Sequence, residues 1–106
     1  MRSMVEMFNT GDVAAAASVV SLDYVDHQGL GTGEIVGVEG FCHVVRVARS
    51  AFISLDVVIR DLIAEDDRAA ARLSWLGTRA TGEQVRRETI EIVRVASRLI
   101  LARGLA

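Results

Sequence analysis

The strongest constraint on the fold is a change of sequence pattern after Phe52. Between residues 38 and 52 apolar residues recur at steps of three and four, which predicts an amphipathic helix. The chain beyond it is rich in Val, Ile, Thr and Leu and is divided by short turns, which predicts antiparallel strands at 55–64, 68–78, 85–95 and 99–103. Helices followed by strands are typical of the α+β class.

Two short helices are expected to open the chain. Met4 and Phe8 lie four residues apart within residues 1–8, and the sequence NTGD at 9–12 marks a break. Asp12 can cap a second helix, in which Val13, Ala16, Val19 and Val20 share one face. Because the chain has no proline, glycines and Asn/Asp clusters mark the other breaks, one of them at 29–33.

The predicted strand at 85–95 mixes polar and apolar groups on both faces. Val85, Arg87, Thr89, Glu91 and Val93 share one face, and Arg86, Glu88, Ile90, Ile92 and Arg94 share the other. A sheet with one face against helices and the other in water would separate the two kinds of residue more cleanly. We therefore predict a curved sheet with a partly polar hollow or a subunit contact.

Length and charge exclude several classes of protein. The length of 106 residues predicts a single domain, spanning 1–106. Hydrophobic residues make up 51% of the chain, which is enough to form one hydrophobic core. The net charge is −2, and the 12 cationic residues, all arginines, are dispersed along the chain. Nucleic acid is therefore not an expected partner, because phosphate binding relies on a concentrated basic patch.

Neither a membrane span nor a metal site is expected. The longest uncharged stretch, at 13–22, is about half the roughly 20 residues that a spanning helix needs. The residues after Met1 lack the apolar core of a secretion signal, so we expect a cytoplasmic protein. Cys42 is the only cysteine, which excludes an internal disulfide, and with His27 and His43 alone beside it we expect no structural metal site.

Six short blocks follow one another along nearly the whole chain. They read MVEMFNTGD (4–12), DYVDH (23–27), GVEGF (37–41), DLIAEDDR (61–68), WLGT (75–78) and ETIEIVRV (88–95). Their order and spacing together resemble the SnoaL-like polyketide cyclase family. The resemblance implies a cone-shaped, cystatin-like α+β barrel, in which N-terminal helices pack within a strongly curved, mainly antiparallel sheet that encloses a pocket.

The resemblance also implies partners and chemistry. Members of the family usually form homodimers through the outer face of the sheet. The characterised cyclases close a ring of a polyketide ester by an intramolecular aldol reaction, with an acidic residue as general acid/base and without metal or organic cofactor. We therefore expect a small hydrophobic ligand and no cofactor.

Two departures from the family pattern bear on the reaction. The final stretch, SRLILARGLA at 97–106, contains no acidic residue, and the catalytic aspartate of the cyclases falls on or near Leu105, which cannot accept a proton. The connection between Thr78 and Val85 is shorter than in the family, which predicts a more open pocket.

Asp26 and His27 are the first candidate catalytic residues. With Asp23 and Tyr24 they form the densest cluster of groups able to move protons, and acid/base chemistry on an apolar substrate needs such groups beside a dry cavity. We predict that Asp26 or His27 lies at the cavity rim and that Tyr24 contacts the ligand. The alternative is a solvated junction between a helix and a loop, where these side chains satisfy the backbone of a turn.

Glu91 is the third catalytic candidate. It lies mid-strand between apolar residues on the same face as Thr89, and the family pattern directs this face into the cone. A carboxylic acid there could have a raised pKa and act as a base or a hydrogen-bond donor. The alternative is a cross-strand ion pair with Arg72 or Arg87. Thr89 is a predicted ligand contact, and Trp75 either forms a flat wall for an aromatic ligand or fills the core.

Three functions remain open. A metal-free cyclase, isomerase or dehydratase would act on a hydrophobic carbonyl compound through Asp26, His27 or Glu91. A non-catalytic domain of the same fold would bind an apolar ligand or serve for dimerisation. An epoxide hydrolase would need an Asp-Arg-Asp arrangement, assembled here from Asp26, Arg72 and Glu91. A cavity carboxylate without an arginine neighbour would favour the enzyme, and a cone filled by side chains would exclude it.

Overall fold

The computed structural model describes residues 1–27 and 35–105, which form two α-helices, a short 3-10 helix and six strands. In chain order the elements are α1 (Arg2–Thr10), η1 (Ala16–Ser18), β1 (Val20–Asp26), β2 (Ile35–Val36), α2 (Gly37–Ser50), β3 (Ser54–Glu65), β4 (Arg68–Thr78), β5 (Gln84–Ala96) and β6 (Leu99–Leu105). The predicted helix at 38–52 and all four predicted strands are confirmed. The expected break at 29–33 lies outside the described residues.

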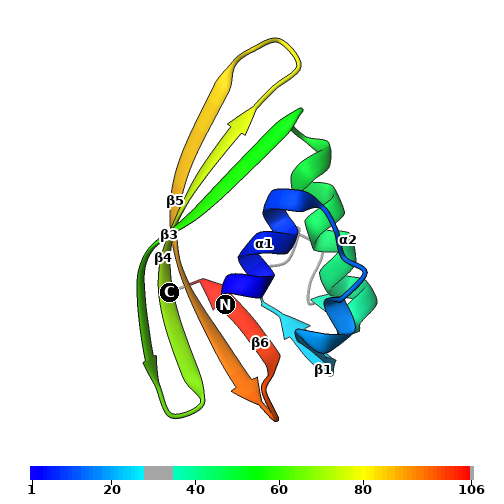
Figure 1. The fold of residues 1–106 in the computed structure, drawn as a ribbon, viewed down its shortest axis with the longest axis vertical. Coiled ribbons are helices and arrows are strands. Elements are labelled where there is room, and N and C mark those ends of the chain that lie inside the picture. The colour runs from blue at the N-terminus through cyan, green and yellow to red at the C-terminus, as the bar shows by residue number, and fades with distance from the viewer. Residues whose placement is uncertain (28–34, 106) are drawn as a thin grey trace.

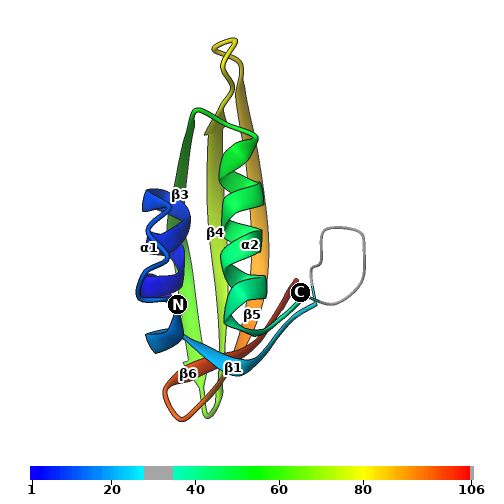
Figure 2. The same ribbon diagram turned by 90° about the vertical axis from the view of Figure 1, so that its right-hand side faces the viewer.

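The strands form one mixed sheet in the order β2-β1-β6-β5-β4-β3. Strands β3 to β6 pair antiparallel with their sequence neighbours, whereas β1 runs parallel to β6. The sheet is strongly curved, and both helices lie on its concave side (Figures 1 and 2). Because β2 and β3 are the two edges and do not pair, the sheet forms an open cone and not a closed barrel. The predicted α+β class and curved sheet are confirmed.

The core lies between the two helices and the concave face. Helix α1 buries Met4, Val5, Met7 and Phe8, and α2 buries Phe41, Cys42 and Val45. These side chains meet the buried Leu73 and Val93 of β4 and β5. Aromatic rings join the layers, since the Phe8 ring stands edge-on to those of Phe41 and Trp75, with centroids 6.1 and 5.2 Å away.

Helix α1 is fixed at its C-terminal end by polar groups. Gly11 terminates the helix with φ 76°, a left-handed conformation that glycine adopts at little cost. The Arg49 guanidinium of α2 donates to the carbonyls of Phe8 and Asn9 at 2.8 and 2.7 Å. The Asn9 amide pairs with the backbone N–H and C=O of Val57. The last turn of α1 is therefore tied both to α2 and to the edge strand β3.

The expected second helix is wrong. Asp12 does accept a hydrogen bond from the Ala14 N–H, but only the three residues of η1 are helical, and Val20 already begins β1. Residues 20–26 gain backbone partners from β6, some eighty positions later in the sequence, and from β2. Long-range pairing thus overrides the helical spacing of the apolar residues. Tyr24 and Asp26 consequently lie on a strand and not at a junction between a helix and a loop.

The two faces of β5 differ as its alternation predicts. Glu91 and Val93 are buried on the concave side, whereas Glu88, Ile90 and Ile92 are exposed on the convex side. On the convex face Arg72 forms ion pairs with Asp61 at 2.7 Å and Glu88 at 3.1 Å.

None of the helices in the described residues is long and apolar enough to cross a membrane.

Candidate functional site

A cavity of about 390 Å³ lies between α2 and the concave face of the sheet. Its wall is mainly apolar, and its polar lining comes from strands β1, β5 and β6 and from the turn after β4. The apolar lining comprises Phe8, Val44, Val47, Ala48, Ala51, Phe52, Leu55, Trp75, Gly77 and Val85. The polar lining comprises Asp26, Arg79, Arg87, Thr89, Glu91 and Arg103.

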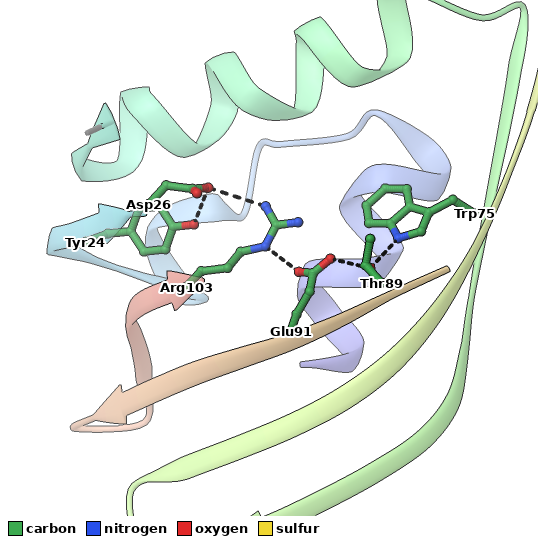
Figure 3. A network of polar contacts seen from close by, with 6 residues as sticks. All are labelled: Tyr24, Asp26, Trp75, Thr89, Glu91 and Arg103. Carbon is green, nitrogen blue, oxygen red and sulfur yellow. Dashed lines mark hydrogen bonds and ion pairs between the residues drawn. The ribbon is translucent and has the colours of Figure 1, made fainter. Parts of the chain in front are cut away.

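A chain of hydrogen bonds joins six side chains at this site (Figure 3). Tyr24 donates its hydroxyl to Asp26 Oδ2 at 2.8 Å. Arg103 donates Nη1–H to Asp26 Oδ2 at 3.4 Å and Nε–H to Glu91 Oε1 at 2.7 Å. Thr89 donates its hydroxyl to Glu91 Oε2 at 3.0 Å, and Trp75 donates its indole N–H to the Thr89 oxygen at 2.8 Å. One arginine therefore bridges two carboxylates.

Sheet order brings these residues together. Strand β6 lies between β1 and β5, so that Arg103 stands between a carboxylate on each neighbour. Residues two apart on a strand share a face, which aligns Tyr24 with Asp26 and Thr89 with Glu91. The register places Asp26 opposite Arg103 in the parallel pair β1–β6. The site thus depends on the one parallel pairing among the described strands.

The site is charged and dry. Asp26 and Glu91 have no exposed surface and Arg103 is 2% exposed. Buried charges persist only when they are paired and hydrogen-bonded. Arg103 lies between the two carboxyl groups and forms an ion pair with each. The Arg103 guanidinium also lies 4.9 Å from the centre of the Phe8 ring, whose face attracts cations.

Burial moves the pKa values of Tyr24 and Arg103. Burial raises the pKa of Tyr24 well above its ordinary value, so the phenol stays protonated and donates to Asp26. For Arg103, burial by itself lowers the pKa, but the attraction of Glu91, together with smaller effects of Tyr24 and Asp26, raises it overall. Arg103 is therefore a permanent cation between the two carboxylates.

The sequence candidates divide into two groups by position. Asp26, Glu91, Thr89 and Trp75 line the cavity, with Trp75 half-buried. Tyr24 is fully buried behind Asp26 and is not among the lining residues of the described chain. His27 is exposed, and its backbone N–H donates to the Arg103 carbonyl at 2.9 Å.

Sequence reasoning missed Arg103, the central residue of the site. The final strand contains no acid, and nothing in its local sequence distinguishes Arg103 from the other arginines of the strands, because its role depends on the neighbouring strands. The ion pair expected for Glu91 exists, but its partner is Arg103 and not Arg72 or Arg87. Arg72 lies on the convex face, so the Asp-Arg-Asp-like arrangement is formed by Asp26, Arg103 and Glu91 instead. Both cavity carboxylates have Arg103 as a neighbour, so the free carboxylate that would have favoured the enzyme is not found among them, whereas the cavity that the enzyme requires is present.

No group of three or more His, Cys, Asp or Glu side chains in the described residues is arranged to hold a metal ion. Cys42 is buried in α2 and His43 beside it is exposed.

Comparison with known proteins places the chain in a family. The family model for the SnoaL-like domain matches residues 1–102. The chain belongs to the SnoaL-like domain family. The resemblance to SnoaL-like polyketide cyclases that the sequence blocks indicated is thereby confirmed, and it covers nearly the whole chain. A search of curated proteins found no match.

Solved structures share this fold. A candidate polyketide cyclase from Bacillus cereus is 24% identical with a TM-score of 0.82, and the alignment covers 94% of this chain but only 66% of that one. A second from Acidithiobacillus ferrooxidans is 19% identical with a TM-score of 0.85, covering 99% and 82% of the two chains. IdmH from Streptomyces antibioticus, also a candidate polyketide cyclase, is 20% identical with a TM-score of 0.85, covering 99% and 86%. At these identities the likeness establishes the fold.

Proposed function

We propose that this SnoaL-like protein binds a small hydrophobic carbonyl compound in its cavity and catalyses proton transfer at the carbon next to the carbonyl group. Ring closure by an aldol reaction, or isomerisation, would follow from the enolate. The proposal rests on one observation: a mainly apolar cavity has two fully buried carboxylates in its wall, and Arg103 lies between them. The reaction needs no cofactor, because these side chains supply both proton transfer and charge.

Glu91 is the proposed general base. The resemblance places the catalytic acid of the family on or near Leu105, and Leu105 pairs with Glu91 across β5 and β6. A carboxylate on the neighbouring strand thus lies beside the position where the family acid is missing. Asp26, on the other side of Arg103, is the alternative base and holds the arginine in place.

Charge balance explains how the base would work. Glu91 takes a proton from the α-carbon, and the electrons of that C–H bond move to the carbonyl oxygen. Arg103, which loses one of its two ionic partners when Glu91 becomes neutral, has five N–H donors and can stabilise the enolate oxygen. The enolate carbon then attacks a second carbonyl, and the new alkoxide takes the proton back from Glu91. The buried site starts and ends with the same charge.

Exchange of α-hydrogen for deuterium tests the enolisation step without knowledge of the natural substrate. We expect the protein to accelerate exchange of 2-tetralone in heavy water, measured by NMR. Glu91→Gln removes the base and should lower the acceleration by about a hundredfold or more. Asp26→Asn should also lower it. Glu88→Gln is the matched control, because Glu88 lies on the same strand, exposed on the convex face.

The same assay separates the enzyme from a binding domain. If the wild-type protein binds the ketone but does not accelerate exchange, or if Glu91→Gln exchanges at the wild-type rate, the catalytic proposal is wrong. A non-catalytic binding domain is then the better description, and the neutralisation of both carboxylates by Arg103 would be its structural basis.

The bridging arginine favours one second candidate, hydrolysis of an epoxide. One carboxylate would take a proton from water, the hydroxide would attack an epoxide carbon, and the other carboxyl group, protonated, would give its proton to the leaving oxygen. Formation of a diol from styrene oxide, lost in Glu91→Gln and kept in Glu88→Gln, would favour this reaction.

We also propose that the protein forms a homodimer through the convex face of the sheet. Ile63 and Ile92 are exposed there, and the register aligns them across β3, β4 and β5 on either side of Ala70. Ile90 adds to the same patch, being 51% exposed. Contiguous apolar surface of this kind marks interaction sites in soluble proteins.

A further inference from the structure

We propose that the ligand carries a negatively charged group, and that Arg87 at the outer end of the cavity binds it while the reacting carbonyl lies at Glu91. This inference rests on the proposed function and specifies its substrate class, a flat aromatic or polycyclic keto carboxylate. It goes beyond the acid/base chemistry because it concerns the opposite end of the cavity.

Arg87 lies on the concave face, in a cavity whose wall is mainly apolar. It shares its face of β5 with Val85, Thr89 and Glu91 and lines the cavity with them. Neighbouring Arg86 alternates to the other face and lines only the groove on the convex side. Arg87 is exposed and lines both the cavity and that groove, so its guanidinium is accessible to a ligand in the cavity.

Arg87 differs from the other two arginines of the cavity in lacking an anionic partner. Arg103 is bound by two carboxylates, and Arg79 pairs with Glu83 at 2.9 Å and stacks on the Phe52 ring. Within residues 1–27 and 35–105, no carboxylate forms an ion pair with Arg87. Its guanidinium therefore offers a planar pair of N–H donors, which match the two oxygens of a carboxylate.

The charges at the two ends of the cavity would orient a ligand. The inner end carries the Asp26 and Glu91 carboxyl groups on either side of Arg103, and Arg103 is already bound by both. The outer end carries the positive charge of Arg87. An amphipathic anion would therefore enter with its neutral carbonyl end first and keep its charged end at Arg87.

The strand also sets the length of the ligand. Arg87 and Glu91 are four residues apart on β5, so their Cα atoms are separated by about 13 Å. An interval of this length accommodates a ligand of two or three fused rings. Trp75 pairs with Arg87 across the strands, and its indole donates to Thr89 (Figure 3), so a flat aromatic surface spans this interval.

A matched pair of probes tests the inference. The acid 6-acetyl-2-naphthoic acid and its methyl ester share the ring system and ketone and differ only in charge. We expect the wild-type protein at low salt to bind the acid about tenfold more tightly than the ester, as measured by calorimetry. High salt should reduce this preference, since the contact is exposed.

Variants then assign the preference to one side chain. Arg87→Gln should bind both probes equally, Arg87→Lys should keep part of the preference, and Arg86→Gln should keep all of it. Equal binding of acid and ester by the wild type, or equal loss of preference in Arg87→Gln and Arg86→Gln, would overturn the inference and leave the cavity proposal intact. Failure of both probes to bind, with the protein folded, would overturn the proposed function as well.

Discussion

At alkaline pH the stability of this protein should depend on the ionisation of one side chain, Tyr24. The chain contains one tyrosine, Tyr24, and no lysine, so Tyr24 alone has an ordinary side-chain pKa near 10. In the fold its hydroxyl is fully buried and donates to Asp26 at 2.8 Å. Ionisation there would place a phenolate beside a carboxylate in a dry site. Burial raises its pKa the most, with a smaller opposing effect of Arg103 and a further increase from Asp26.

The magnitude follows from proton linkage. Below about pH 10 the phenol is protonated in both the folded and the unfolded chain, and Tyr24 has no effect on the pH dependence of stability. Above that pH the unfolded chain releases the proton while the folded chain keeps it. The free energy of unfolding should therefore fall by up to about 1.4 kcal/mol per pH unit, and by about 2.3 kcal/mol in total between about pH 10 and about pH 12.

Two measurements test this prediction. Phenolate absorbance should rise with a midpoint near pH 10 in concentrated urea and should stay absent from the native protein until circular dichroism reports unfolding. Urea denaturation at increasing pH should give the expected loss of stability, and Tyr24→Phe should abolish most of it. A native protein whose phenol titrates near pH 10, or a Tyr24→Phe variant as pH-sensitive as the wild type, would refute the buried Tyr24–Asp26 pair.

Two further predictions concern the buried cation and the convex face. Arg103→Met removes the cation that bridges two buried carboxylates and should lower the free energy of unfolding by about 3–5 kcal/mol in urea denaturation. Arg86→Met on the exposed face should change it little, and an equal effect of both would contradict the bridging role. Light scattering should give the mass of a dimer for the wild type and of a monomer for Ile92→Glu at the same concentration, and a monomeric wild type would rule out the proposed interface.

Local pattern was sufficient for much of the fold. The spacing of apolar residues in α2 and the alternation in β3, β4 and β5 appear in the sequence because each element must bury one side of itself. The same alternation placed Thr89 and Glu91 on one face, and the structure has both on the concave side. The spacing of apolar residues from Val13 to Val20 predicted a helix, whereas β1 begins at Val20. The local sequence does not indicate that this segment pairs with β6, which lies about eighty residues later.

The amino-acid sequence by itself determined the fold class, the family and which face of β5 carries a carboxylate, since these depend on periodicity and on short blocks of residues. Only the tertiary structure decided what that carboxylate meets. Asp26 and Arg103 are 77 positions apart and become neighbours through the parallel pairing of β1 with β6. An ion pair between strands leaves no periodic pattern in the sequence. Which residues pair depends on sheet order and register, and these are set by the packing of the whole chain.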